Sequence, residues 1–257
     1  AVTIGDINGI GIKLLIHIWK QKKFRKFVLF CNIDIFKNYL RKHKIKLKIN
    51  LKNNNYNYEK DSFNVYSFIS NSKNKNTLKS LDLSHALCRN NKFIGVVTLP
   101  LRKDLIIKNL YKNFTGHTEY YQKLENKPHS NMMLIHKNLI VSTLTTHTQL
   151  KLVSKIISEK NYIKKRIESI NQSLKIDFGI KKPKLLVSGL NPHAGENSTI
   201  GKEEEEAILP QLKYLKKNGI IVDGPVSADS MINEYNLKKY NCFIFMFHDQ
   251  ALIPFKY

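Results

Sequence analysis

The chain has 257 residues, of which 42% are hydrophobic and 25% are charged. A chain of this length and composition builds one large or two ordinary α/β domains, and its apolar content excludes global disorder. The formal net charge of +23 is typical of proteins that bind nucleic acid. The lysines are scattered along the chain, however, so we attribute the charge to a general bias in composition and expect no nucleic-acid partner.

Cysteines and apolar runs indicate the cellular compartment. Cys31, Cys88 and Cys242 are odd in number and never form a Cys-x-x-Cys pair, which argues against a disulfide scaffold and a thiolate zinc site. No apolar run has the length of a membrane span, and Asp6 lies where a signal peptide would have its apolar core. We therefore expect a cytoplasmic protein without a membrane partner.

The N-terminal segment has the pattern of a strand, a glycine-rich loop and a helix. Residues 2–4 predict a short strand, residues 5–11 contain three glycines, and residues 12–19 are rich in apolar side chains. Such a unit favours an anion or a cofactor near the helix start. The glycine spacing differs from the Rossmann fingerprint and the P-loop, so a plain tight turn explains the segment equally well.

Further apolar runs predict a parallel sheet in the first half of the chain. We expect strands at residues 26–31 and 93–98, helices at 33–43 and 82–90, and a polar surface loop at 48–62. Alternation of strands and helices is typical of a mostly parallel sheet.

A short polar motif follows at residues 114–119. Gly116, His117 and Thr118 precede an expected helix at residues 120–124, with Thr115 or Thr118 as the N-cap. Amide N–H groups, a hydroxyl and an imidazole at a helix start together form a small phosphate cradle. An ordinary capped turn is the equally good alternative.

The second half of the chain continues the alternation. We expect a hairpin at residues 132–135 and 139–144, strands at 185–187 and 242–247, and helices at 149–173, 201–217 and 231–238. Residues 203–206 are all glutamates, and we expect them to be the solvated start of their helix, where negative charge complements the helix dipole. We expect residues 223–229 to be a loop, and the residues after His248 to be a short proline-bearing segment.

Three histidines follow predicted strands. His147, His193 and His248 each come within a few residues of the end of an apolar run. Because parallel strands deliver the residues after them to one edge of a sheet, these histidines predict one metal site with an open, catalytic position. The alternative for each is a polar side chain that bonds to a backbone carbonyl. Lys256 is either a substrate-binding cation near this site or one more lysine of a lysine-rich chain.

Six short motifs then occur in the order of one known family. They are GDINGIG at residues 5–11, GHTE at 116–119, TTH at 145–147, LNPHAGE at 190–196, DGP at 223–225 and HDQ at 248–250. On these motifs the chain resembles the 4-hydroxythreonine-4-phosphate dehydrogenase (PdxA) family over essentially its whole length. NPHAGE, HDQ and GHTE are highly specific as a set.

The resemblance implies an α/β subunit with an isocitrate/isopropylmalate dehydrogenase-like two-domain fold, a mostly parallel sheet and an interdomain cleft. It implies a homodimer with the active site at the interface, and NAD or NADP bound without the Rossmann fingerprint. The domains are expected at residues 1–113 and 114–257. In the family a later segment completes the first domain and supplies further substrate-binding residues, and that segment is absent from this sequence.

The resemblance also implies roles for single residues. The implied ligands of a divalent metal, Zn²⁺, Co²⁺ or Mg²⁺, are His147, His193 and His248. The implied contacts to a small phosphorylated amino-acid substrate are His117, Thr118 and Lys256. Asp249 and Lys103 are our predictions for catalytic proton handling or orientation.

The implied reaction belongs to pyridoxine 5′-phosphate (vitamin B6) biosynthesis. NAD(P)⁺ oxidises 4-phosphooxy-L-threonine at C3 to 2-amino-3-oxo-4-phosphooxybutanoate, which decarboxylates to 3-amino-2-oxopropyl phosphate. One alternative is a related metal-dependent dehydrogenase of another phosphorylated hydroxy acid. A second alternative is an inactive basic binding protein on the same fold, for which we would expect salt-sensitive binding to nucleic acid.

Overall fold

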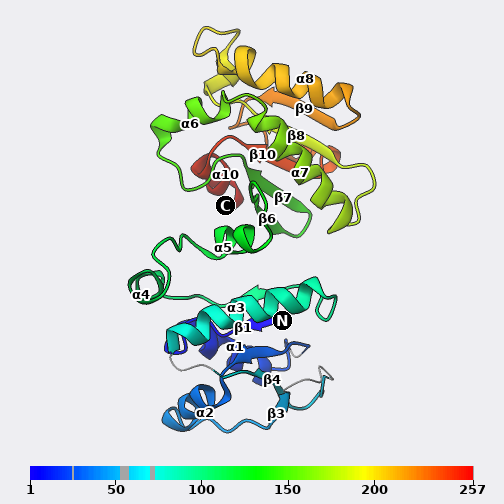
Figure 1. Cartoon of the computed structure of the whole chain (residues 1–257). Coiled ribbons are helices and arrows are strands. Elements are labelled where there is room, and N and C mark those ends of the chain that lie inside the picture. The colour runs from blue at the N-terminus through cyan, green and yellow to red at the C-terminus, as the bar shows by residue number, and fades with distance from the viewer. Residues whose placement is uncertain (25, 53–57, 70–72, 257) are drawn as a thin grey trace. The chain divides into compact units, whose positions relative to one another are not determined.

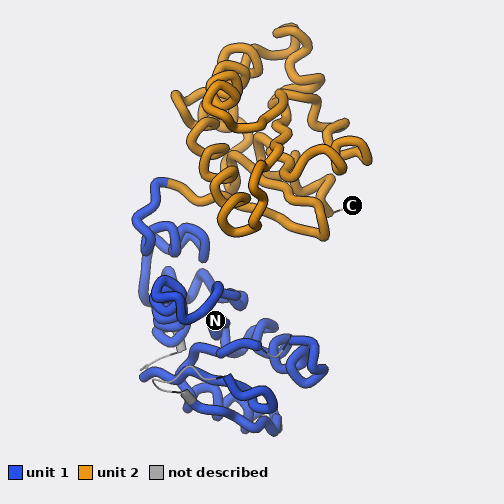
Figure 2. The backbone as a smooth tube through the Cα atoms, turned by 90° about the vertical axis from the view of Figure 1, so that its right-hand side faces the viewer, with its two compact units in different colours: residues 1–128 blue, residues 129–257 orange. Residues whose placement is uncertain are grey.

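The computed structural model describes residues 1–24, 26–52, 58–69 and 73–256. The backbone forms two compact units, residues 1–128 and 129–257 (Figures 1 and 2). Each unit has its own sheet and its own apolar core. No helix among the described residues is long and apolar enough to cross a membrane. The predicted division into domains at residues 1–113 and 114–257 stays a prediction.

The first unit alternates strands and helices. Its elements are β1 (Val2–Thr3), α1 (Ile10–Lys20), β2 (Leu29–Cys31), α2 (Ile33–Lys42), β3 (Ile49–Lys52), β4 (Phe63–Ser67), α3 (Lys73–Arg89), β5 (Val97–Thr98), α4 (Lys103–Asn109) and α5 (His117–Leu124). The strand order is β3-β4-β2-β1-β5, and the paired strands are parallel. Side chains of β2 alternate between two cores: Leu29 and Cys31 pack with α1 and α2, whereas Phe30 packs with residues of α3. Burial on both faces of the parallel sheet explains why β2 is apolar throughout.

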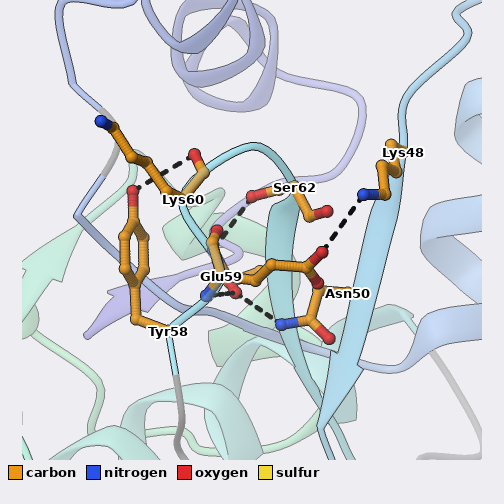
Figure 3. A network of polar contacts seen from close by, with 7 residues as sticks. Lys48, Asn50, Tyr58, Glu59, Lys60 and Ser62 are labelled. Carbon is orange, nitrogen blue, oxygen red and sulfur yellow. Dashed lines mark hydrogen bonds and ion pairs between the residues drawn. The ribbon is translucent and has the colours of Figure 1, made fainter.

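Strand β3 corrects one prediction. Residues 48–62 were expected to be a polar loop, but β3 pairs with β4, which had no counterpart among the predicted strands. The buried Asn64 side chain accepts a hydrogen bond from Asn50 Nδ2 at 2.9 Å and donates one to the Glu59 carbonyl at 2.9 Å. Figure 3 shows Asn50 and Glu59 in this network. Asn50 of β3 has its partner in Asn64 of β4, and such polar residues gave this segment the composition of a loop. Residues 53–57 lie outside the described residues.

Helix α5 corrects a second prediction. The helix begins at His117, its N-cap is Gly116, and no side chain caps it. The N-cap roles predicted for Thr115 and Thr118 are therefore wrong. The predicted helix at residues 82–90 is the C-terminal half of the longer α3, and α4 was not predicted.

The second unit also has a five-stranded sheet, in the order β6-β7-β10-β8-β9. Its elements are β6 (Met132–His136), β7 (Leu139–Thr143), α6 (Leu150–Ile157), α7 (Tyr162–Ile176), β8 (Lys184–Ser188), η1 (Pro192–Gly195), η2 (Glu204–Ile208), α8 (Leu209–Lys217), β9 (Ile221–Val226), α9 (Glu234–Lys239), β10 (Cys242–Phe245) and α10 (His248–Lys256). β6 and β7 form the predicted antiparallel hairpin, and the other pairs are parallel. Cys242 and Ile244 pack with α6, α7 and α8, while Phe243 and Phe245 pack with Ala251 of α10.

The single helix predicted at residues 149–173 is two helices, α6 and α7 (Figure 1). Asn161 between them adopts a left-handed conformation with φ of 65°, which a right-handed helix cannot include and which asparagine tolerates. Val153 and Ile157 of α6 are buried, whereas Leu152 is 40% exposed. The apolar stripe of α6 therefore contains Val153 and Ile157, which lie four positions apart on one face of the helix.

Two further segments differ from their predictions. Residues 223–226 belong to strand β9 instead of a loop, and the Gly224–Pro225 peptide bond is cis. The residues after His248 form helix α10 despite Pro254 within it. Pro210 lies at the start of α8, where proline is tolerated because the first-turn N–H groups have no helical partner.

Candidate functional site

All three strand-end histidines follow strands at the carboxyl edge of the second sheet. β7, β10 and β8 are neighbours and run parallel, so the loops after them leave the sheet at the same edge. His147 follows β7, His193 lies in η1 after β8, and His248 begins α10 after β10. This edge is where open α/β sheets bind their ligands.

His147 and His248 lie close together. Their ring centroids are 5.9 Å apart and their planes meet at 44°. His248 Nδ1 is 2.7 Å from Oδ1 of Asp249, the predicted catalytic carboxylate. The structure therefore places Asp249 where it can orient the His248 ring.

Backbone hydrogen bonds fix the ends of β7 and β10 relative to each other. The Leu144 N–H donates to the Phe245 carbonyl at 2.8 Å, and the Thr145 N–H donates to the Met246 carbonyl at 3.1 Å. The Thr145 hydroxyl, which is buried, donates to the Met246 carbonyl as well, at 2.8 Å. Thr145 thus anchors the start of the loop that carries His147 to the end of the neighbouring strand β10.

Gln250 of the HDQ motif joins the ends of β8 and β10. Its Nε2 donates to the Gly189 carbonyl at 2.9 Å. Its Oε1 accepts from the Met246 N–H at 2.9 Å and from the Ser188 hydroxyl at 3.2 Å. Gln250 was not among the predicted site residues, although its place in the HDQ motif indicates that it belongs to the site.

His193 lines a cavity of about 430 Å³. Residues 227–229, which follow β9, form another part of the wall, and Phe247 and Gln250 complete it. The Ser227 hydroxyl donates to Asp229 Oδ1 at 2.5 Å, and this bond lowers the pKa of the Asp229 carboxyl below 3.8. An ionised carboxylate therefore lines the cavity together with His193.

The loop that carries His193 has an unusual backbone. Six consecutive residues have φ between 41° and 81°: His193, Ala194, Gly195, Glu196, Asn197 and Ser198. For a residue with a side chain, this left-handed conformation costs about 1 kcal/mol or more. Other contacts must hold the loop in it, because such strain persists only where the surroundings fix it.

Glu204 fixes the two residues that lead into this left-handed run. Only 6% of it is exposed. Its Oε1 accepts from the backbone N–H groups of Leu190 and Asn191 at 2.7 and 2.8 Å. The prediction that all of residues 203–206 are a solvated helix start is therefore wrong for Glu204. A Cβ on Gly195 would lie 2.6 Å from Glu204 Oε2, so glycine lets the loop close around the carboxylate.

The other predicted site residues, Lys103, His117 and Thr118, belong to the first unit. Lys103 Nζ would lie 3.6 Å from a Cβ on Gly116, directly beside His117. Burial lowers the pKa of His117 below 6.5, and the Lys103 charge lowers it further. His117 Nε2 is buried and has no hydrogen-bond partner in the described part of the chain, and Thr118 is exposed. The ammonium group of Lys103 thus lies near a His117 imidazole that is neutral.

Lys256 lies at the far end of α10 from His248. With a rise of 1.5 Å per residue, the Cα atoms of the two residues are about 12 Å apart. The predicted contact of Lys256 with substrate stays a prediction.

The predicted metal site is only partly assembled. Two imidazoles at the spacing of His147 and His248 fit two positions around one ion. Among the residues that the structure describes, however, no three His, Cys, Asp or Glu side chains are grouped as ligands of one ion. His193 lies on the same sheet edge without joining the pair, so the three-histidine site stays a prediction.

Two units with mostly parallel sheets, and polar loops at the carboxyl ends of the strands, are typical of α/β enzymes, which bind small ligands at a sheet edge. A family model described as "Pyridoxal phosphate biosynthetic protein PdxA" matches residues 22–257. The chain belongs to this family, and its role lies in vitamin B6 biosynthesis.

Known relatives agree with this assignment. A 4-hydroxythreonine-4-phosphate dehydrogenase of Pseudoalteromonas atlantica is 32% identical over 269 residues, covering 100% of this chain and 82% of the relative. One of Sulfurihydrogenibium sp. is 40% identical over 162 residues, covering 63% of this chain and 49% of the relative. A crystal structure of a 4-hydroxythreonine-4-phosphate dehydrogenase from Burkholderia phymatum matches 99% of this chain and 82% of its own, with TM-score 0.85 and 26% identity. The predicted α/β fold with mostly parallel sheets is confirmed.

Proposed function

We propose that the chain oxidises 4-phosphooxy-L-threonine at C3 with NAD⁺ or NADP⁺, giving 2-amino-3-oxo-4-phosphooxybutanoate, which then decarboxylates. The observation that carries the proposal is the placement of His147, His193 and His248 at one sheet edge of a PdxA-family chain. The names of the relatives support this substrate.

The described residues support distinct parts of this chemistry. When bound, a divalent ion supplies Lewis acidity toward a hydroxyl, and a nicotinamide supplies the hydride acceptor. Asp249 accepts the Nδ1–H of His248, which leaves Nε2 of that ring free to act at the site. The wall of the cavity beside His193 offers the Ser227 hydroxyl oxygen and the Asp229 carboxylate to a polar ligand.

Lys103 and His117 suit the phosphorylated end of the substrate. The Lys103 ammonium attracts an anion, and a neutral His117 can donate one N–H to an oxygen without competing for protons near neutral pH. We further propose a homodimer, following the family resemblance. The three unpaired cysteines support a reducing compartment such as the cytoplasm.

The test mixes the purified chain with 4-phosphooxy-L-threonine, NAD⁺ or NADP⁺, and Zn²⁺, Co²⁺ or Mg²⁺, and follows the absorbance of the reduced nicotinamide. We expect metal-dependent reduction. No signal with any metal, under conditions where a PdxA relative is active, would contradict the proposal. A panel of other phosphorylated hydroxy acids distinguishes the proposed substrate from a related one.

A further inference from the structure

Two adjacent carboxylates meet one side-chain amide beside the His193 loop. Asn191 Nδ2 donates to Glu203 Oε2 and to Glu204 Oε2, at 2.9 Å in both cases. Glu203 is the N-cap of η2 and Glu204 is its first residue. Both carboxylates therefore come from the start of one helical segment and converge on the residue two positions before His193.

Glu204 holds the main chain of the loop. The two N–H groups of Leu190 and Asn191 donate to the same Oε1 atom. Because these donors are consecutive, the bond pair fixes the direction in which the chain leaves β8. The chain then enters the left-handed run that starts at His193.

Glu203 connects this loop to the loop of His147. Its Oε1 accepts from the Ser154 hydroxyl at 2.6 Å, and Ser154 lies on α6, the first helix after His147. The hydrogen bonds from Ser154 and then Asn191 lower the pKa of the Glu203 carboxyl, which is therefore ionised near neutral pH. A continuous path of hydrogen bonds thus runs from α6 through Glu203 and Asn191 to Glu204.

We infer that Glu203 and Glu204 are positioning residues, which hold the loop of residues 189–198 and its His193 in one conformation and connect it to α6. They touch no reacting atom. The inference rests on the proposed function only in treating this loop as part of the active site. Glu205 also contacts this loop, because it accepts a hydrogen bond from the Ser198 hydroxyl, but it does so from an exposed position. Glu206 is exposed and serves as the control.

The test is amide hydrogen exchange of the whole chain, compared among the parent, Glu204→Ala, Glu204→Gln and Glu206→Gln. In Glu204→Ala, we expect the Leu190 and Asn191 amides to exchange about 10- to 100-fold faster, because their side-chain acceptor is lost. The Glu204→Gln variant keeps one carbonyl oxygen for the two N–H groups, so their exchange stays within about threefold of the parent. Glu206→Gln makes the same chemical change at an exposed position and should alter neither amide.

Amides of β10 report whether the unit remains folded. Unchanged exchange at Leu190 and Asn191 in Glu204→Ala, with β10 still protected, overturns the inference. So does exchange in Glu204→Gln as fast as in Glu204→Ala, because the assigned acceptor would then be wrong. If Glu204→Ala does not fold, exchange of these amides in Glu204→Gln more than about tenfold faster than in the parent, with β10 still protected, overturns the inference.

A kinetic comparison separates positioning from general stability. In a chain that has the proposed activity, kcat should fall about tenfold or more in Glu204→Ala, be partly restored in Glu204→Gln, and stay unchanged in Glu206→Gln. Equal kcat in all four proteins overturns the inference. An inactive parent refutes the proposed function instead, and the exchange rates then decide the inference alone.

Discussion

The rings of His147 and His248 lie with their centroids 5.9 Å apart, although the two residues come from distant parts of the chain. The parallel pairing of β7 with β10 brings them together, with Thr143 opposite Phe245 at the strand ends. Hydrogen bonds from Leu144 and Thr145 to β10 continue the pairing beyond the strands. The strand pairing therefore sets the two backbone positions from which the rings approach each other.

Replacing Gly195 with alanine should destabilise the His193 loop. Gly195 has φ of 81°, and an added Cβ would lie 2.6 Å from Glu204 Oε2. We expect a loss of about 1–3 kcal/mol in the free energy of unfolding, measured by urea denaturation. Gly179→Ala is the matched control, because Gly179 has φ of 67° and nothing within 4 Å of the added carbon. Equal losses in the two variants would show that Gly195 does not pack against the carboxylate.

Replacing Gln250 with leucine should destabilise the second unit. The change removes the bonds to Gly189, Met246 and Ser188, and it leaves the Gly189 carbonyl and Met246 N–H without these partners. Since an unsatisfied buried polar group costs about 1–3 kcal/mol, we expect a loss of at least that size in urea denaturation. Gln21→Leu, at an exposed position of the first unit, should change little. A Gln250→Leu chain as stable as the parent would contradict the bridging role.

His117 should give the chain an acid-sensitive component of stability. Its pKa in the folded chain lies below the ordinary value of 6.5, so the unfolded chain binds a proton first as the pH falls. The contribution to the free energy of unfolding is complete above about pH 6.5 and declines as the pH falls toward the lowered pKa. The His117→Gln variant should lose stability less steeply than the parent between about pH 7 and pH 5. Identical slopes for the two proteins would mean that burial does not perturb this histidine.

The sequence was sufficient to predict the strands, and the edge at which they end, where apolar runs are followed by turn residues. The runs before His147, His193 and His248 are strands, and a parallel sheet leaves no choice about the edge at which they end. The same pattern failed for β3, whose Asn50 side chain bonds to Asn64 of the neighbouring strand β4. A composition of Asn and Lys does not distinguish such a strand from a loop.

Glu204 shows why part of the site was missed. Four consecutive glutamates are typical of a solvated helix start, and the partners of Glu204 are backbone N–H groups that no residue pattern reveals. One signal was present: Glu204 is in helical phase with the buried Ala207 and Ile208, whereas Glu205 and Glu206 are exposed. A charged residue on the apolar stripe of a helix predicts a buried, bonded carboxylate.

The central claim is that the strand-end histidines together form one metal site. The most direct measurement is Co²⁺ binding by equilibrium dialysis to the parent and to His147→Ala, His193→Ala and His248→Ala, with the exposed His136→Ala as control. We predict one bound ion per chain in the parent and the control, and affinity weakened about 100-fold or more in each of the three variants, since even indirect partners of a metal are worth 10- to 100-fold. Stoichiometric binding of Co²⁺ by His193→Ala with the affinity of the parent would contradict the account.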